Sequence, residues 1–569
     1  MKNQNKLLKK ITSVFVLFIM ILGCSDDYVD LNPSSTLNPD VLANLDGLDA
    51  LLLSAYAAMD GHTGGLTNSG WQSDHANWLY GEIASDNALK GSSIGDQPDM
   101  NLIEQGEMNP ASVYMDALWG SIYEGVARAN AVINTMANAE DLNDADRQRI
   151  EGEAKFLRAH FHHYGRRYFG NLPYINETVT DFRVPNDRDI FSDIEADYLS
   201  AIQNLPLDPT DVGRAHRSAA QASLAKLYLD EKMFAEAKPL LDAIINSGRY
   251  RLFDNYQDNF TLANEKSIVD TELIFQIQAL GRQGQLNGRI IMGIAQLHGC
   301  CGFIQPSQNL VNSFKTDGNG LPLLDSFNDV DLSNDQGITT KEPFSPPTDN
   351  LDPRLDYTVA RRGIPFLDFE IGLLQGDANL FPGQSYVVDQ TTYGPYRAKK
   401  MMPTKAEVDG GISFLGSGSI NYSVHRYADI LLLRAEVAIE ENDLATALSL
   451  VNQIRNRAKN SEVIRFQDGT PAANYVIEPY AFFPSQEFAR KAVRFERRLE
   501  LALEGFRWYD LVRWGIAEET MLEYFATEGR PLLTAFGKYT SDYMPIPSNQ
   551  IDITRDDEGN PTLIQNSGY

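Results

Sequence analysis

Two stretches of this chain decide its fold, and they are related to each other. Residues 217–250 read RSAAQASLAKLYLDEKMFAEAKPLLDAIINSGRY, and residues 427–460 read YADILLLRAEVAIEENDLATALSLVNQIRNRAKN. At an offset of 210 residues the two segments align, which pairs Ala225 with Ala435, Phe234 with Leu444, Ala237 with Ala447, Leu241 with Val451 and Ile244 with Ile454. Small and apolar residues at matching positions indicate an internal repeat.

Each copy of the repeat predicts a pair of helices. In the first copy, apolar residues recur three and four positions apart, at Leu224, Leu227 and Tyr228 and then at Ala237, Leu240, Leu241, Ile244 and Ile245. This spacing places one apolar stripe along each helix. A unit of about 34 residues with small residues where the helices cross is the tetratricopeptide pattern. Residues 48–59, 111–136 and 145–169 also have a period near that of a helix.

The rest of the chain differs in texture from these helices. Between about residues 251 and 421, Gly, Asn, Asp and Pro interrupt short apolar runs, which predicts loops, short helices and a few short strands. We therefore expect a mainly α fold, with helical repeats in residues 43–250 and 422–520 and a loop-rich part between them. No linker rich in Pro, Gly or Ser divides the chain, so residues 43–569 are expected to form a single body.

The N-terminus has the layout of a secretory signal. Four lysines, Lys2, Lys6, Lys9 and Lys10, precede an apolar stretch at residues 11–23. At about 1.5 Å per residue, this stretch reaches roughly 20 Å as a helix, which is shorter than the roughly 30 Å hydrocarbon core of a bilayer. We expect residues 1–23 to be cleaved.

The residues at the cleavage point resemble the lipobox of bacterial lipoproteins. Ile21, Leu22 and Gly23 stand directly before Cys24, whose thiol would take the lipid and anchor the chain through a tether at residues 24–42. The alternative is an ordinary signal peptide with a chance cysteine. Ser25-Asp26-Asp27 resembles the signal that sends some lipoproteins to the cell exterior, and a plain polar tether is the other interpretation.

Charge excludes some partners. The formal net charge is -28, and removing residues 1–23 takes away four lysines and no acids, which leaves -32. Such a chain repels phosphate backbones and anionic lipid, so we expect no nucleic-acid partner, whereas neutral sugars meet no such penalty. Apart from Cys24, the cysteines are the adjacent Cys300 and Cys301. They are expected either to close a vicinal disulfide or to stay as free thiols.

Several motifs occur in order along nearly the whole mature chain. They are EAKFLRA at 153–159, YFGNLP at 168–173, GRA at 213–215, DPR at 352–354, RYAD at 426–429, ERRLEL at 496–501, GFRWYDLVRW at 505–514 and PIP at 545–547. Together they resemble the SusD/RagB family of outer-membrane nutrient-binding lipoproteins. The resemblance implies four tetratricopeptide-like helix pairs. It also implies a surface lipoprotein that captures oligo- or polysaccharide as the lid of a TonB-dependent, SusC-like outer-membrane transporter.

The charged motif near the C-terminus has a structural interpretation. Arg497 stands at helical spacing from Glu500 and Glu504, and Arg507 from Asp510, which predicts ion pairs between adjacent helices. We expect buried Arg and Glu networks that fix helix packing and take no part in catalysis. Three tryptophans lie on helical stripes and are expected in the core: Trp119, Trp508 and Trp514.

The other two tryptophans are candidates for glycan binding. A sugar needs an aromatic platform ringed by short polar side chains. Residues 67–92 supply both, with Trp71, Trp78, Tyr80, Asp74, His75, Asn77, Asp86 and Asn87. Trp78 has a core position as its alternative, because it stands beside Leu79 and near Ile83 on a helical pattern. Further candidates lie in the loop-rich part, at His298, Phe303, Gln305, Tyr393 and Tyr396.

Enzymatic motifs are missing from the sequence. His160, His162 and His163 lack the His-Glu-x-x-His arrangement of zinc hydrolases, and a solvated helix face is the expected explanation for them. No Gly-x-Ser-x-Gly elbow or phosphate loop occurs. We expect a binding protein that requires no cofactor, with calcium an open alternative because Asp and Asn are plentiful in the loops. Peptide or protein cargo is the second hypothesis, and a glycoside hydrolase is a remote third.

Overall fold

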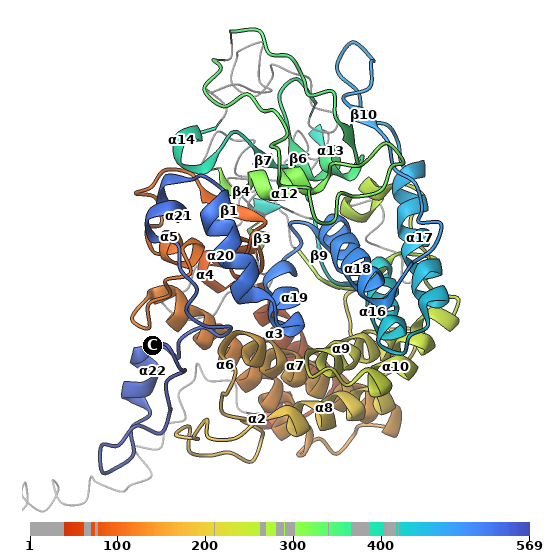
Figure 1. Cartoon of the computed structure of the whole chain (residues 1–569). Helices are drawn as coiled ribbons and strands as arrows, with labels where there is room; N and C mark the ends of the chain where they lie inside the picture. Colours follow the sequence, from red (N-terminus) through yellow and green to blue (C-terminus); the bar gives the residue numbers. More distant parts are fainter. Residues whose placement is uncertain are drawn as a thin grey trace, which may run out of the picture.

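The computed structural model describes residues 39–61, 70–73, 78–209, 211–261, 269–279, 289–290, 302–339, 341–365, 387–402, 404–405, 417–418 and 420–569. Within these ranges the fold is mainly α-helical, and every strand belongs to a two-stranded sheet. The helices form a scaffold in the lower half of Figure 1, and the short strands and loops lie above it. No described helix combines the length and the apolar character needed to cross a membrane.

Eight helices build the scaffold, each packed against the next. They are α3 (Leu45–Ala57), α6 (Val113–Met136), α7 (Asp144–Phe169), α8 (Phe191–Asn204), α9 (Arg217–Asp230), α10 (Phe234–Asn246), α16 (Tyr427–Glu440) and α17 (Leu444–Asn460). The helices expected at 48–59, 111–136 and 145–169 are thus confirmed to within a few residues. The order of packing gives the four helix pairs that the resemblance implies.

The internal repeat is confirmed in three dimensions. Helices α9 and α16 begin 210 residues apart, and so do α10 and α17. The aligned residues Leu241 and Val451 are both fully buried, as are the aligned alanines. The equivalence extends to the turn inside each pair, where Lys232 and Asn442 both adopt a left-handed backbone conformation, with φ of 59° and 60°. Sequence periodicity and local backbone geometry therefore agree.

Polar caps set where several of these helices begin. The Ser112 hydroxyl accepts a hydrogen bond from the Tyr114 N–H, and the Asn143 and Asp443 side chains accept from the N–H groups of Asp146 and Thr446. Each bond satisfies a backbone donor that has no partner within its helix. The helix starts are therefore fixed by short polar residues just ahead of the apolar stripes.

The C-terminal part packs on the scaffold and completes the core. It comprises α18 (Gln486–Leu501), α19 (Arg507–Trp514), α20 (Ala517–Thr527), α21 (Pro531–Phe536) and α22 (Ser548–Ile553). One hydrophobic core cluster extends from Leu48 to Leu563 and includes residues of both repeat copies. Trp119, Trp508 and Trp514 are buried, which confirms their predicted core positions.

Short elements occupy the remaining described segments. The helical ones are α2 (Pro39–Leu42), η2 (Ala58–Asp60), α4 (Gly70–Ser73), η3 (Trp78–Ile83), α5 (Asp99–Glu104), η4 (Tyr256–Phe260), α12 (Gln308–Ser313), α13 (Arg354–Thr358) and α14 (Gln390–Tyr393). The strand pairs are antiparallel β1 (Ala88–Gly91) with β4 (Phe303–Pro306), β2 (Leu273–Ile277) with β9 (Tyr422–Arg426), β3 (Arg289–Ile290) with β8 (Ser417–Gly418) and β6 (Val359–Ala360) with β7 (Arg397–Ala398), and parallel β5 (Asn350–Leu351) with β10 (Asn474–Tyr475).

The histidines of α7 correct one expectation. His160, His162 and His163 are buried, so they do not lie on a solvated face. The ring of His162 is held between two backbone groups: Nδ1 lies 3.0 Å from the Arg158 carbonyl oxygen, and Nε2 lies 3.2 Å from the Ile175 nitrogen. A carbonyl only accepts and an amide N–H only donates, so these contacts require the neutral ring with its proton on Nδ1. Burial correspondingly lowers the pKa of His162 to about 3.

Candidate functional site

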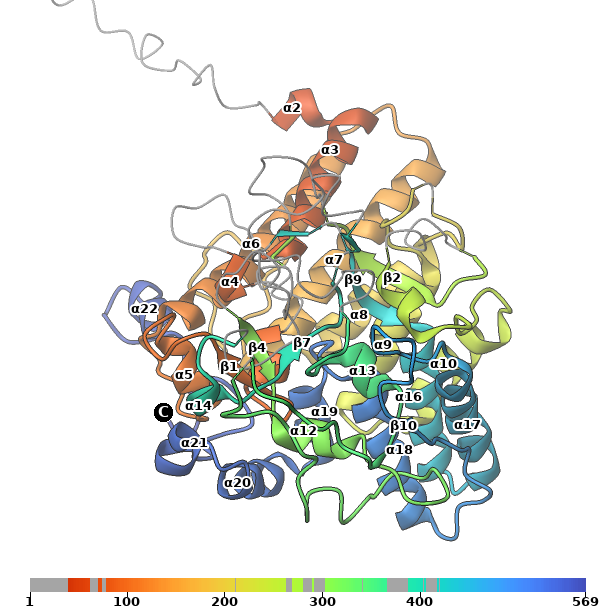
Figure 2. The same cartoon turned by 90° about the horizontal axis from the view of Figure 1, so that it is seen from above.

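Segments that are far apart in the sequence converge above the scaffold. Strand β1, at the end of the predicted glycan segment, pairs with β4, which directly follows the cysteine segment. Helix α14 packs against β1, and β7 packs against β4, which brings the segment with Tyr393 and Tyr396 to the same place. Helix α4, the backbone of which includes Trp71, packs against β3. Figures 1 and 2 show β1, β4, β7 and α14 beside one another in both views.

Four of the predicted platform residues are buried, which corrects their assignment. A ring that stacks on a sugar must present a face to the ligand. The exposed fraction is 6% for Trp78 and 0% for Tyr393, and Tyr80 and Tyr396 are buried as well. Trp78 belongs to η3, all residues of which are buried, so its core alternative is confirmed.

These buried rings form the foundation of the converging face. The ring centroids of Trp78 and Phe303 lie 6.4 Å apart. Lys90 Nζ lies between two rings, 5.7 Å from the centroid of Phe303 and 5.2 Å from that of Tyr393. Gln305 Nε2 donates hydrogen bonds to the carbonyl oxygens of Gly394 and Tyr396, at 3.1 and 2.9 Å. Residues predicted as separate candidates therefore make one packed cluster.

Polar groups in this foundation are also committed to structural contacts. Lys90 Nζ donates to the carbonyl oxygens of Ser93 and Asp96, at 2.8 and 2.6 Å. Burial lowers the pKa of Lys90 to about 8, against the attraction of nearby Glu104. Burial raises the pKa of Glu104 to about 8. Both groups therefore titrate near neutrality.

Asp86 and Asn87 tie the predicted glycan segment to the C-terminal helices. Asp86 forms ion pairs with Arg507 at 2.7 Å and with Arg498 at 3.1 Å. Burial alone would raise the pKa of Asp86, but the two arginines lower it to about 2. Asn87 donates to the Glu82 carboxylate and accepts from Arg498, both at 2.9 Å. These two residues fix the end of the segment and are not free to bind a sugar.

The remaining candidates lie outside the part of the chain that the structure describes. This holds for Cys24, Asp74, His75, Asn77, His298, Cys300 and Cys301 and for the side chain of Trp71. Their predicted roles stay predictions. Within the described residues, no group of three or more His, Cys, Asp or Glu side chains could hold a metal ion.

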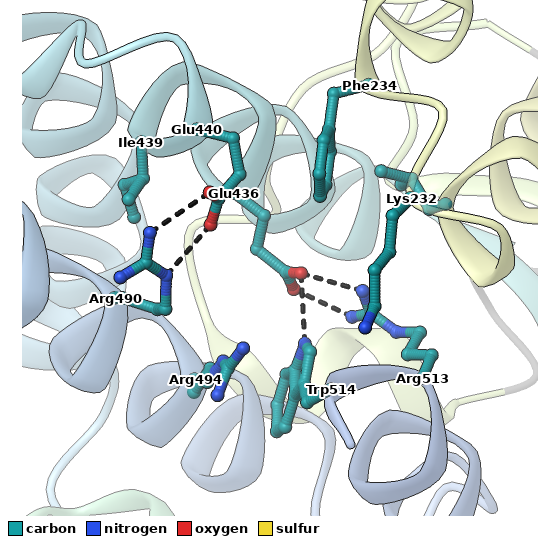
Figure 3. A pocket seen from close by; sticks show the side chains of 10 residues that line it. Lys232, Phe234, Glu436, Ile439, Glu440, Arg490, Arg494, Arg513 and Trp514 are labelled. Atoms are coloured by element: carbon teal, nitrogen blue, oxygen red, sulfur yellow. Dashed lines mark hydrogen bonds and ion pairs between the residues drawn. The ribbon is translucent and has the colours of Figure 1, made fainter. Parts of the chain in front are cut away.

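Two cavities that sequence reasoning missed lie within the described residues. The first, of about 280 Å³, is lined by Asn255, Gln257, Tyr357, Lys399 and residues 462–465 beside η4 and α13. Gln257 Nε2 is buried there without a hydrogen-bond partner in the described structure, so it can donate to a ligand hydroxyl. The second, of about 240 Å³, lies between the two copies of the repeat and is shown in Figure 3.

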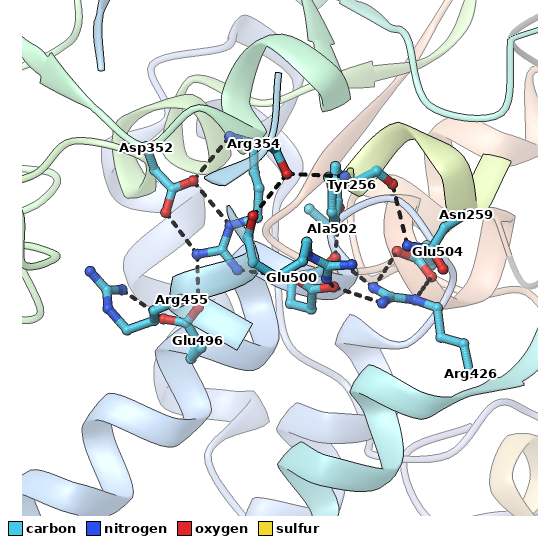
Figure 4. A network of polar contacts seen from close by, with 12 residues as sticks. Tyr256, Asn259, Asp352, Arg354, Arg426, Arg455, Glu496, Glu500, Ala502 and Glu504 are labelled. Atoms are coloured by element: carbon cyan, nitrogen blue, oxygen red, sulfur yellow. Dashed lines mark hydrogen bonds and ion pairs between the residues drawn. The ribbon is translucent and has the colours of Figure 1, made fainter. Parts of the chain in front are cut away.

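A buried ionic network lies where the loop-rich part meets the repeats (Figure 4). Glu500 pairs with Arg354, Arg426 and Arg457, and Glu504 pairs with Arg426 and Lys400. Arg497 instead pairs with Asp429 and Asp510, and Arg507 with Asp86. The expectation of buried networks between helices is confirmed. The expected partners, Glu500 and Glu504 for Arg497 and Asp510 for Arg507, are wrong.

Comparison with known proteins follows the same division of the chain. The family model described as "SusD family" matches residues 271–569, and the one described as "Starch-binding associating with outer membrane" matches residues 27–229. A curated relative, the SusD-like protein P2 of Formosa agariphila, is 26% identical over 564 residues, covering 95% of this chain and 97% of that protein.

Solved structures share the fold over nearly the whole chain. A SusD superfamily protein from Bacteroides vulgatus superposes with a TM-score of 0.66 at 20% identity, covering 92% of this chain and 99% of that one. The surface glycan-binding protein A from Bacteroides thetaiotaomicron, in complex with laminarihexaose, gives a TM-score of 0.64 at 19% identity, covering 92% and 100%. Because the SusD family model alone spans more than half of the sequence, this chain belongs to the SusD family.

Proposed function

We propose that this protein is a cell-surface lipoprotein that captures an oligo- or polysaccharide and delivers it to a TonB-dependent, SusC-like outer-membrane transporter. In this proposal Cys24 carries the lipid, the body faces the cell exterior and the protein acts as the lid of the transporter. It binds its glycan without hydrolysing it.

The convergence of three distant segments carries the proposal. Strand pairing and helix packing bring residues near Trp71, near the cysteine pair and near Tyr393 to one face. Beneath that face, Trp78, Phe303 and Tyr393 form a packed base around Lys90. A rigid base of this kind holds loop aromatics in place, which lowers the entropic cost of binding a ligand.

Two further observations support a glycan as the ligand. The structural neighbour from B. thetaiotaomicron is a surface glycan-binding protein that holds laminarihexaose. The formal net charge of -28 disfavours polyanionic ligands and leaves neutral sugars unaffected. Peptide or protein cargo is the alternative for the same face.

The test is a glycan array followed by calorimetry on the hits, with the mature protein from Ser25 onward. We expect Trp71→Ala to weaken binding at least about tenfold, because an aromatic platform contributes on the order of 1.5 kcal/mol. Phe482→Ala is the matched control, since Phe482 is 67% exposed and belongs to none of the converging segments. It should bind like the wild type.

Each result bears on a different part of the proposal. Glycan binding that Trp71→Ala leaves unchanged would remove Trp71 from the site. If no glycan binds but peptides protect the loop aromatics from quenching, the protein takes peptide cargo. Chromatography of each bound glycan after long incubation with pure protein should show no shortened products, and any cleavage would contradict the proposal of binding alone.

A further inference from the structure

The pocket between the two copies of the repeat has an unusual charge. It lies where the end of α9 and the start of α10 face α16, α18 and α19 (Figure 3). Four cationic side chains line it, Lys232, Arg490, Arg494 and Arg513, against two carboxylates, Glu436 and Glu440. A local excess of positive charge is unexpected in a chain with a formal net charge of -28.

Two of the arginines already have carboxylate partners. Arg490 makes a bidentate pair with Glu440, at 2.8 and 3.0 Å. Arg513 makes a bidentate pair with Glu436, at 2.7 Å for both contacts, and also pairs with Asp510 at 2.8 Å. Glu436 additionally accepts a hydrogen bond from Trp514 Nε1 at 3.1 Å. The two carboxylates of the pocket are thus fully engaged.

Arg494 is the cation without a counter-ion. Among the residues that the structure describes, it forms no ion pair, and it has no dashed contact in Figure 3. Its guanidinium group stacks over the Trp514 ring, 4.9 Å from the centroid. Burial lowers the pKa of Arg494, and the neighbouring Arg513 and Arg490 lower it further against the attraction of Glu436 and Glu440. An added anion would relieve this repulsion.

Lys232 supplies a second cation at the opposite wall. It is exposed, has no ion pair in the described structure and stands in the left-handed conformation of the turn between α9 and α10. The equivalent turn position in the second copy of the repeat is Asn442, an uncharged residue that suits this conformation. Local backbone geometry therefore does not explain the lysine.

We propose that this pocket binds the carboxylate or sulfate group of an acidic sugar residue. Arginine guanidinium groups bind such oxyanions through paired, charge-assisted hydrogen bonds. A volume of about 240 Å³ exceeds what a bare ion needs and fits one sugar ring. Phe234 and Ile439 line the same pocket and offer apolar surface to the C–H faces of that ring.

The choice of a sugar as the ligand rests on the proposed glycan-binding function, but the site itself is separate. The pocket is built from α9, α10, α16, α18 and α19, whereas the converging face is built around β1, β4, β7 and α14. Trp71→Ala should therefore abolish capture at the face and leave the pocket intact, and Arg494→Gln should do the reverse. The two proposals fail independently.

Calorimetry with glucuronate and glucose 6-sulfate, and with glucose as the neutral control, tests the proposal. We expect both acidic sugars to bind the wild type, and Arg494→Gln to weaken them about tenfold or more through loss of a charge-assisted contact. Lys232→Asn, which introduces the residue of the equivalent turn, should weaken them to a smaller extent. Lys491→Gln is the matched control, because it removes a charge from the same helix at a site 51% exposed and outside the pocket.

Several outcomes would overturn the proposal. These are acidic sugars that do not bind, binding that Arg494→Gln leaves unchanged, glucose that binds equally well at this site, and sulfate or acetate ions or an Asp-Glu dipeptide that bind as tightly as the sugars. Arg494→Lys guards against a folding defect, because it retains the charge and should retain most of the affinity that Arg494→Gln loses. Equal loss in both variants, with thermal unfolding unchanged, would also contradict the proposed role.

Discussion

Glu500 offers the sharpest test of how this fold is held together. Its carboxylate lies at the centre of a buried network in which five cations, Arg354, Lys400, Arg426, Arg455 and Arg457, face five carboxylates, Glu272, Asp352, Glu496, Glu500 and Glu504. Glu500 alone contacts three of the arginines, including Arg426 at 2.6 Å and Arg354 at 3.0 Å. Glu500→Gln keeps the shape of the side chain and leaves one buried positive charge uncompensated.

The expected cost is about 3–5 kcal/mol of unfolding free energy at neutral pH, the usual range when one partner of a buried ion pair is removed. Burial alone would raise the pKa of Glu500, but Arg457, Arg426 and Arg354 lower it well below its usual range. A lowered carboxyl pKa stabilises the fold above the unfolded-state value near 4.5. The advantage of the wild type over Glu500→Gln should therefore stay constant from pH 7 to about 5 and shrink as the pH falls further.

Urea denaturation followed by circular dichroism measures this difference. Asp325→Asn is the control, because it breaks the exposed pair with Lys491 and should leave the unfolding midpoint unchanged within error. A loss below about 1 kcal/mol for Glu500→Gln would refute the view that the network is tightly coupled. A difference that grows as the pH falls from 5 to 3 would refute the assigned direction of the pKa shift.

Two further predictions concern the helical scaffold. His162→Gln preserves both backbone contacts without a titrating ring; because the folded pKa is about 3 and the usual value is 6.5, the wild type should lose about 3 kcal/mol relative to the variant between pH 7 and 4.5, measured by urea denaturation at each pH, and parallel pH profiles would contradict this. Leu241→Ala, at a fully buried position of the repeat, should lower the unfolding free energy by about 2–5 kcal/mol, and a loss under about 1 kcal/mol would show that this position is not part of a tightly packed core.

The periodic parts of the chain were predictable because helical spacing is a local property. The repeat copies begin their helices at residues 217 and 427, as the apolar stripes indicate, and the aligned Leu241 and Val451 are buried. The core positions of Trp119, Trp508 and Trp514 follow from the same stripes. Ordered motifs along the chain also identified the family, which the match of the SusD family model to residues 271–569 confirms.

The partners of charged residues were harder to predict. Arg497 stands at helical spacing from Glu500 and Glu504, but it pairs with Asp429 of α16 and Asp510 of α19. Arg507 pairs with Asp86, more than 400 residues away in the sequence. Spacing within one helix says which charges share a face of that helix, whereas the helix that packs on the face decides which charges meet.

The sequence by itself determined the helical repeat, the core tryptophans and the family, because period, residue size and motif order are written along the chain. Only the tertiary structure decided that Trp78, Tyr80, Tyr393 and Tyr396 are buried and that Trp78, Phe303 and Tyr393 pack around Lys90. It also placed Arg494 without a counter-ion beside Trp514. The exposure of a ring and the pairing of a charge depend on segments that arrive from elsewhere in the chain, and no local pattern records that arrival.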